Sequence, residues 1–325
     1  MNLQPDQLTG ASCHAQIKTG GSQDSSWLPA PAQLRASHDE VHVWRVSLEE
    51  THASKLQSLL DDDERMRAAR YRFPEHRNRF IVARGALRSI LGVYLDTEAT
   101  ALRFSYSDYG KPALAEGSPG TVPSSNRANR TRRNRRFSLR THLRLVSSNP
   151  LSYFSASQTN VQTPALSLLP EKGRETNQLN FNLSHSRGFM LLAVTRGREV
   201  GVDIELIDRE FATAEVAERF FSQREIFSLR SQPNPLQTEA FFNCWTRKEA
   251  YIKARGEGLT LPLDQFDVSL DPSGASLLEN RIFPGDRTRW SLQELHPAPD
   301  YCAAVAVEGF SWKLRLLDFN SSSLV

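Results

Sequence analysis

Two acidic residues stand two positions apart in an apolar stretch, Val200-Gly201-Val202-Asp203-Ile204-Glu205-Leu206. This alternation predicts a strand, in which residues i and i+2 project from the same face, with Cα atoms about 6.5–7 Å apart. Asp203 and Glu205 would then lie side by side, and two such carboxylates repel one another unless a cation lies between them. Hard oxygen ligands of this kind suit Mg²⁺, which also takes phosphate oxygens from a substrate. An ordinary solvated strand face is the alternative.

A second group of reactive side chains lies in a segment with helical periodicity, residues 234–255. Asn234 is expected to cap this helix, with Pro235 at its first position. Trp245, Glu249 and Lys253 follow at i, i+4 and i+8, which places them on one face. A surface ion pair between Glu249 and Lys253 would explain the same pattern without a special function.

The two groups together resemble the signature of the 4′-phosphopantetheinyl transferases, Sfp-like class, in which GxDIE is followed by WxxKEAxxKxxGxG. Four further segments match in the same order along the chain. They are the helix Arg79 to Arg88, the turn Tyr109-Gly110-Lys111-Pro112, Asn182-Leu183-Ser184-His185-Ser186, and Arg219-Phe220-Phe221-Ser222-Gln223-Arg224-Glu225. The resemblance covers residues 41–117 and 179–308.

The resemblance implies a reaction and a set of site residues. The phosphopantetheine arm of coenzyme A would pass to a serine of an apo carrier protein, acyl or peptidyl, with release of 3′,5′-ADP. Asp203, Glu205 and Glu249 would hold Mg²⁺ against the diphosphate. Lys253 would stabilise or protonate the leaving nucleotide, and Glu225 would be the base for the carrier serine. Ser184 and His185 would contact the 3′-phosphate side of the nucleotide, beside Lys111 and Arg67.

Other basic residues near these motifs have two interpretations. Arg79, Arg84 and Arg88 would either assist phosphate binding or be solvated helix positions. Lys248 would either touch phosphate or remain solvated.

The expected fold is α+β, because strands and helices mix without strict βαβ alternation. Strands are predicted over 41–46, 102–106, 189–194, 199–206, 266–270, 289–295 and 301–307, and helices over 56–73, 75–95, 211–221, 222–229 and 234–255. Residues 179–186 are predicted to be ordered, without an assigned element. By resemblance, the fold consists of two similar pseudo-symmetric halves with coenzyme A at their junction. The expected divisions are a disordered lead-in over 1–37, an N-terminal half over 38–117, a basic, disordered insertion over 118–178, a C-terminal half with the Mg²⁺ site over 179–310, and a tail over 311–325.

Composition sets further limits. The chain has 325 residues and a formal net charge of +3. Its three cysteines lack CxxC spacing, so neither a disulfide framework nor a zinc site is predicted. No apolar run reaches the length of a membrane span, and the first 37 residues carry no apolar core of a secretory signal. We expect a monomeric, cytoplasmic enzyme that does not associate with membranes.

Three alternatives remain open at this stage. A Mg²⁺-dependent phosphohydrolase would use the carboxylates but would not explain the SHS and YGKP segments. A nucleic-acid-binding protein would use the Arg-rich tract between Arg127 and Arg144, which lacks the interleaved aromatic residues of such readers, so nucleic acid is not the expected main partner. An inactive relative would have been disabled by the insertion.

Overall fold

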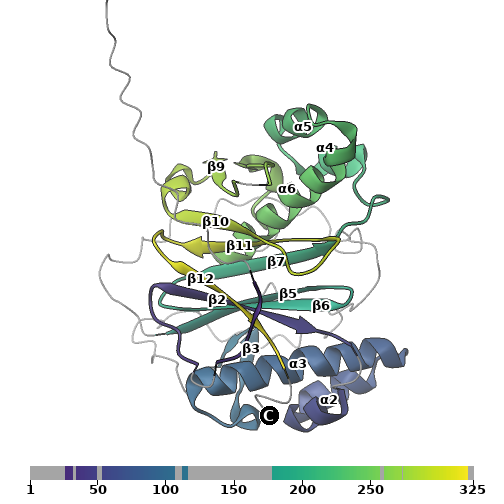
Figure 1. Cartoon of the computed structure of the whole chain (residues 1–325), viewed down its shortest axis with the longest axis vertical. Coiled ribbons are helices and arrows are strands. Elements are labelled where there is room, and N and C mark those ends of the chain that lie inside the picture. The colour runs from purple at the N-terminus through teal and green to yellow at the C-terminus, as the bar shows by residue number, and fades with distance from the viewer. Residues whose placement is uncertain are drawn as a thin grey trace, which may run out of the picture.

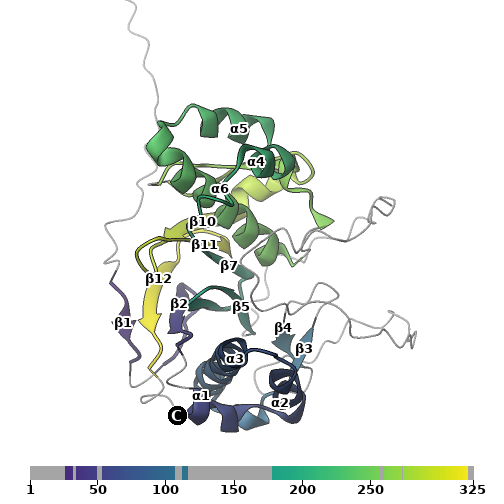
Figure 2. The same cartoon turned by 90° about the vertical axis from the view of Figure 1, so that its right-hand side faces the viewer.

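The computed structural model describes residues 26–31, 34–49, 53–106, 112–115, 178–256, 260–272 and 274–320. These residues build four stacked layers, helix, sheet, sheet and helix, from bottom to top of Figure 1. Figure 2 shows the same stack from the side, with α3 (Pro74–Leu95) below the sheets and α6 (Asn234–Arg255) above them. The fold is therefore α+β, as the sequence predicts.

The outer helices resemble one another in length and in their ends. Each has 22 residues and a proline in its first turn. The helix α3 ends at Asp96 and α6 at Gly256, both with left-handed backbone, which stops a helix. The prediction of Asn234 as a cap is wrong by one position, because Pro233 occupies the N-cap and Asn234 is the first helical residue.

The lower sheet has five strands in the order β1-β12-β2-β6-β5. These are β1 (Leu28–Pro29), β12 (Lys313–Asp318), β2 (Glu40–Ser47), β6 (Phe189–Arg196) and β5 (Leu179–Ser186). Pairing is parallel from β1 through β12 to β2 and antiparallel from β2 through β6 to β5. Trp44, Val46 and Leu192 on one face belong to a core with the apolar face of α3.

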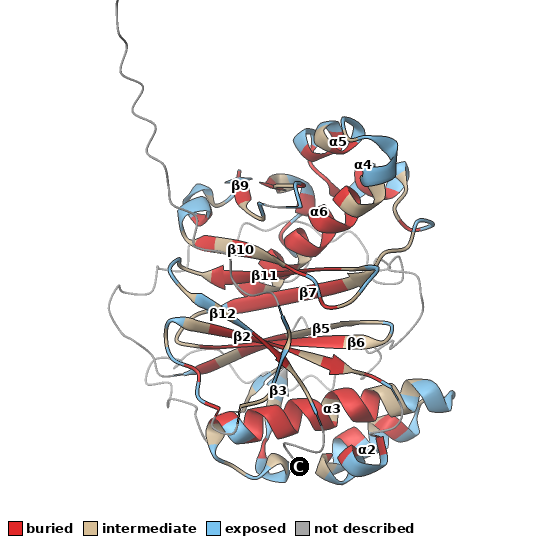
Figure 3. Cartoon of the chain, viewed as in Figure 1, coloured by how far each residue is buried: buried red, intermediate tan, exposed pale blue. Residues whose placement is uncertain are grey.

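The upper sheet is antiparallel, in the order β10-β11-β7. Its strands are β10 (Trp290–Leu295), β11 (Tyr301–Glu308) and β7 (Val200–Leu206). Val202, Ile204 and Val305 form a core with Val43 and Leu191 of the lower sheet. The opposite face of β11 packs with α6. Figure 3 shows how burial concentrates on the strands of both sheets and along α3 and α6.

Shorter elements complete the described chain. Beside α3 are α1 (Ala53–Leu56), the 3-10 turn η2 (Gln57–Leu59), α2 (Asp62–Ala69), η3 (Ala99–Ala101) and the pair β3 (Phe104–Tyr106) and β4 (Pro112–Leu114). Around α6 are α4 (Ala214–Phe220), α5 (Gln223–Arg230), η6 (Leu263–Gln265), η7 (Pro284–Thr288) and the pair β8 (Phe266–Val268) and β9 (Leu277–Asn280). The helix predicted over 56–73 is thus divided into separate pieces.

The sheets differ from the expected division of the chain. Residues 28–29 form β1, and Leu34 and Ala36 are buried, so the expectation of a lead-in up to residue 37 is corrected. Residues 313–318 form β12 instead of a tail, because their apolar side chains complete the lower sheet. The strands β5 and β6, assigned to the C-terminal half, pair with β2 of the N-terminal half. The predicted insertion falls almost entirely outside the described residues.

No helix in the described part of the chain combines the length and the apolarity that a bilayer span requires.

Candidate functional site

The strand β7 carries Asp203 and Glu205 beneath α6, and Gly201 sets how closely these elements approach. A Cβ atom at position 201 would lie 2.1 Å from the Ala250 carbonyl oxygen and 2.3 Å from the Ala254 nitrogen. Real Cβ atoms do not come this close to backbone, so only glycine fits. The glycine of the GxDIE segment therefore allows the helix with Glu249 and Lys253 to lie directly on the strand with the acidic pair.

The strand β5 contacts β7 through side chains where the edges of the two sheets meet. The Ser184 hydroxyl donates to Asp203 Oδ1 at 2.8 Å, and the Ser186 hydroxyl donates to Glu205 Oε2 at 2.9 Å. Asn182 Oδ1 accepts from the Val202 backbone N–H at 2.9 Å. Alternation along β5 turns these three side chains toward β7 and His185 toward the opposite face.

Lys253 lies over the Asp203 carboxylate. Its ammonium donates to Asp203 Oδ1 at 2.5 Å and to the Ser184 hydroxyl oxygen at 3.0 Å. Asp203 is 2 % exposed, and the second oxygen of its carboxylate, Oδ2, is buried without a hydrogen-bond partner. One oxygen of this carboxylate is thus held in place, while the other has no donor, which is a costly arrangement unless a cation approaches it.

The other two acidic residues are influenced by Asp203. Burial, followed by the Asp203 charge, raises the pKa of Glu205 to about 8, although the Ser186 hydrogen bond opposes the rise. Burial also raises the pKa of Glu249 to about 7, where the nearby Lys253 charge lowers it and Asp203 raises it. Glu249 and Asp203 therefore lie within electrostatic range of one another. Both pKa values are raised because these groups bring negative charge together in a region shielded from water.

The donor set fits a hard divalent cation. Carboxylate oxygens are the preferred ligands of Mg²⁺, and the buried Asp203 Oδ2 has no hydrogen-bond donor, which leaves this oxygen available to a cation. Across the described part of the chain, no group of three or more His, Cys, Asp or Glu side chains is already gathered around one point. Lys253 supplies the positive charge at Asp203 in this arrangement.

Glu225, predicted as the base, lies in a different environment. It is 1 % exposed and forms a reciprocal capping box with Ser222 at the start of α5. Its Oε1 accepts from the Val268 N–H, and its Oε2 lies 2.8 Å from the Lys248 ammonium. With both oxygens engaged inside the protein, Glu225 is not positioned to take a proton from a carrier serine.

Lys248 is neither solvated nor available to phosphate. It is fully buried and donates to the Leu263 and Phe266 carbonyl oxygens, at 2.6 Å each, besides its ion pair with Glu225. Together these contacts fasten α5, η6 and β8 to α6. The two sequence interpretations of Lys248 are both replaced by a structural one.

The N-terminal arginines form a second buried network. Arg84 and Arg88 donate through their Nε atoms to the two oxygens of Glu64, at 2.6 Å each. Arg88 is fully buried and also reaches Asp61 and the carbonyl oxygens of Ala99 and Leu102. These two arginines fasten α2 to α3, so they neither bind phosphate nor remain solvated.

The predicted nucleotide contacts are only partly described. Arg67 lies on α2 with its guanidinium 5.6 Å from the centre of the Phe80 ring. The pKa of His185 is lowered by burial and then by the Lys253 charge, which favours the neutral ring. Lys111 and Glu257 to Leu259 lie outside the described residues.

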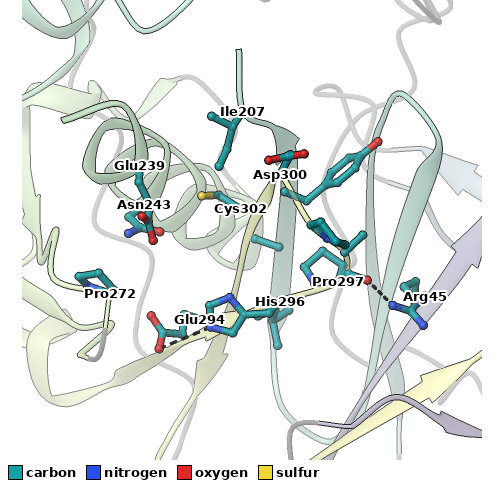
Figure 4. Close-up of a pocket in the computed structure, with 15 residues that line it drawn as sticks. Arg45, Ile207, Glu239, Asn243, Pro272, Glu294, His296, Pro297, Asp300 and Cys302 are labelled. Atoms are coloured by element: carbon teal, nitrogen blue, oxygen red, sulfur yellow. Dashed lines mark hydrogen bonds and ion pairs between the residues drawn. The ribbon is translucent and has the colours of Figure 1, made fainter. Parts of the chain in front are cut away.

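A pocket of about 590 Å³ lies farther along the upper sheet (Figure 4). It is lined by residues of α6, by the loop before β11 and by Cys302, and it includes none of the predicted site residues. Glu239, Glu294 and Asp300 make its lining acidic, which does not suit a polyanion such as coenzyme A. The pocket is therefore not the candidate site.

Two residues that bear on the site have no role in the sequence prediction. They are Asn182 and Ser186, both in the NLSHS segment. Their signal was the spacing itself, since Ser184 and Ser186 are two residues apart, as are Asp203 and Glu205. Recognising the match required knowing that β5 and β7 lie together.

The amino-acid sequence is similar to that of known enzymes. Residues 199–306 match the sequence model of the 4′-phosphopantetheinyl transferase superfamily. The chain is 35 % identical to the 4′-phosphopantetheinyl transferase HetI of Nostoc sp., over 89 % of this chain and 96 % of that protein. It is 23 % identical to the 4′-phosphopantetheinyl transferase Sfp of Bacillus subtilis, over 79 % of this chain and 86 % of Sfp. On these matches the chain belongs to the 4′-phosphopantetheinyl transferase superfamily and is an enzyme that transfers phosphopantetheine to carrier proteins.

Proposed function

We propose that this enzyme transfers 4′-phosphopantetheine from coenzyme A to a serine of an apo acyl or peptidyl carrier protein, with Mg²⁺ as cofactor. The serine oxygen bonds to the β-phosphorus of coenzyme A as its hydroxyl proton passes to solvent, and the bond from that phosphorus to the bridging oxygen of the diphosphate breaks. The products are a phosphodiester on the carrier and 3′,5′-ADP. Because β5, β7 and α6 of one chain supply the site, the proposed enzyme is a monomer, and its proposed location is the cytoplasm.

Asp203, Glu205 and Glu249 would hold the cation. When bound, Mg²⁺ would act as a Lewis acid that neutralises charge on the diphosphate oxygens. The observation that carries this assignment is the buried, unpartnered Oδ2 of Asp203, next to two carboxylates whose pKa values respond to its charge.

The chain's own basic side chains would complete substrate binding. We assign Lys253 to the leaving 3′,5′-ADP, since its ammonium already lies at Asp203, where the diphosphate would approach. His185, with Lys111 and Arg67, is proposed for the nucleotide end. Glu225 is not assigned as the base, because both of its oxygens are engaged within the protein.

The test is modification of an apo carrier protein incubated with coenzyme A and Mg²⁺, followed by mass spectrometry of the carrier. The wild-type enzyme should add the phosphopantetheine mass, and a chelator should abolish the addition. Asp203→Ala should lower the rate by about 100-fold or more, the size of effect expected when charge stabilisation is lost. Release of phosphate from coenzyme A without carrier modification would instead indicate a phosphohydrolase.

A further inference from the structure

Two serines on β5 stand opposite the two acidic residues on β7. Ser184 donates to Asp203 and Ser186 donates to Glu205, at 2.8 and 2.9 Å. The two serines have the same spacing as the two acidic residues because both strands place alternate residues on one face. Neither the predicted metal ligands nor the expected nucleotide contacts require this correspondence.

The direction of each hydroxyl is fixed by a second hydrogen bond. Ser186 Oγ accepts from the Leu206 backbone N–H at 3.1 Å, so its own proton is left to donate to Glu205. Ser184 Oγ accepts from the Lys253 ammonium at 3.0 Å, so its proton is left to donate to Asp203. A serine hydroxyl has one proton to give. Each serine hydroxyl therefore donates its one hydrogen bond to a carboxylate.

This arrangement leaves one oxygen of each carboxylate out of the serine contact. In Asp203 the remaining oxygen is Oδ2, which is buried and unpartnered. In Glu205 it is Oε1, because Oε2 is the oxygen that accepts from Ser186. Hydrogen bonds to ligands from outside the coordination sphere commonly orient metal sites.

We propose that Ser184 and Ser186 are positioning residues that orient Asp203 and Glu205 for the divalent cation, in addition to any contact of the segment with nucleotide. This inference rests on the proposed function, because it presupposes that these carboxylates hold the cation. Ser184 and Ser186 would orient the carboxylates, whereas His185 lies on the opposite face of β5.

The experiment measures Mn²⁺ binding without turnover. Wild type and variants are saturated with coenzyme A in the absence of carrier protein, and free Mn²⁺ is titrated by electron paramagnetic resonance. Ser184→Ala and Ser186→Ala should each weaken Mn²⁺ binding about 10-fold, and the double variant more, as is typical of outer-shell ligand partners. Ser186→Thr keeps the hydroxyl and should restore binding to within about 3-fold of wild type.

Asn180→Ala is the matched control. Asn180 lies on the same strand and the same face, but donates to the Arg198 carbonyl oxygen at 2.9 Å, away from the carboxylates. The Asn180→Ala variant should have a lower melting temperature, but its Mn²⁺ affinity should change by no more than about 2-fold. This result would separate damage to β5 from loss of ligand orientation.

The outcomes distinguish this inference from the proposed function. If Asp203→Ala abolishes Mn²⁺ binding while both serine variants bind like wild type, the serines do not position the ligands. If wild type binds no Mn²⁺, or Asp203→Ala leaves binding unchanged, the metal assignment itself fails and the inference fails with it. Weakened binding in Asn180→Ala equal to that in the serine variants would also overturn the inference.

Discussion

Individual residues show where a motif match stops being informative. The Arg219 to Glu225 segment matches the transferase pattern, which led to Glu225 as the expected base. The same letters contain Ser222-Gln223-Arg224-Glu225, a capping box that begins a helix. The sequence thus held the structural explanation, but only the packing of Lys248 and Val268 against Glu225 decides between the two roles.

Replacing Glu225 tests the structural role. Glu225→Gln keeps the capping geometry but leaves the Lys248 ammonium buried without its charge partner. Breaking a buried pair from one side should lower the free energy of unfolding by about 3 kcal/mol. Urea denaturation measures this loss, and kcat well below the melting temperature should fall by less than about 3-fold, since general-base catalysis would contribute 10²–10⁴-fold.

A double variant provides the control for this prediction. Glu225→Gln combined with Lys248→Met removes both charges and should regain part of the lost stability, because the two residues are coupled. A 100-fold loss of kcat in Glu225→Gln with unchanged stability would restore the base assignment.

At the scale of elements, local patterns located the parts that matter most. Apolar spacing predicted α3, the start signal at Asn234 and Pro235 predicted α6, and alternation predicted β7, because each of these patterns belongs to a single element. The strands β1 and β12 were missed, since they are short or terminal and their pairing joins distant parts of the chain. The approach of β5 to β7 could not be predicted either, as it depends on how two sheet edges meet.

Gly201 is the element-scale test. Gly201→Ala places a Cβ against the α6 backbone, which cannot shift without moving the whole helix. We expect a loss of about 3 kcal/mol in unfolding free energy, at the upper end for overpacking. Thermal and urea denaturation measure it, together with Mn²⁺ binding, which should weaken as Glu249 moves away from β7.

The matched control is Gly274→Ala, where an added Cβ meets no atom within 4 Å. Its stability should remain within about 0.5 kcal/mol of wild type. Equal stability of the two alanine variants would refute the close-packing role of Gly201.

At the scale of the whole molecule, the mixture of strands and helices predicted the α+β fold, whereas the predicted residue boundaries of the two halves do not follow the sheets. Strands from both ends of the chain and from beyond the predicted insertion share the lower sheet. The family motifs gave the order of the parts, but strand exchange between halves is a property of topology that no local pattern records.

Removing the predicted insertion tests its role. The strands β4 and β5, which flank it, lie in contact, so a short linker can join them at little entropic cost. Deleting residues 120–176 should leave the melting temperature within a few degrees of wild type and carrier modification intact within about 3-fold.

Mobility-shift assays on duplex DNA at low and physiological salt test the alternative that the chain binds nucleic acid, because such a protein would lose its affinity for DNA when the Arg-rich tract is removed. Loss of transfer activity in a folded deletion variant would contradict the prediction.

The position of β12 has a consequence for biosynthesis. This strand lies between β1 and β2, so the lower sheet is incomplete until residues 313–318 have been synthesised, well after β1 and β2. The layer that β2 belongs to therefore departs from the order of synthesis in which domains ordinarily fold. A nascent chain stalled before residue 313 would keep β2 with an open edge, and a stop codon there would damage a sheet whose other strands lie far upstream.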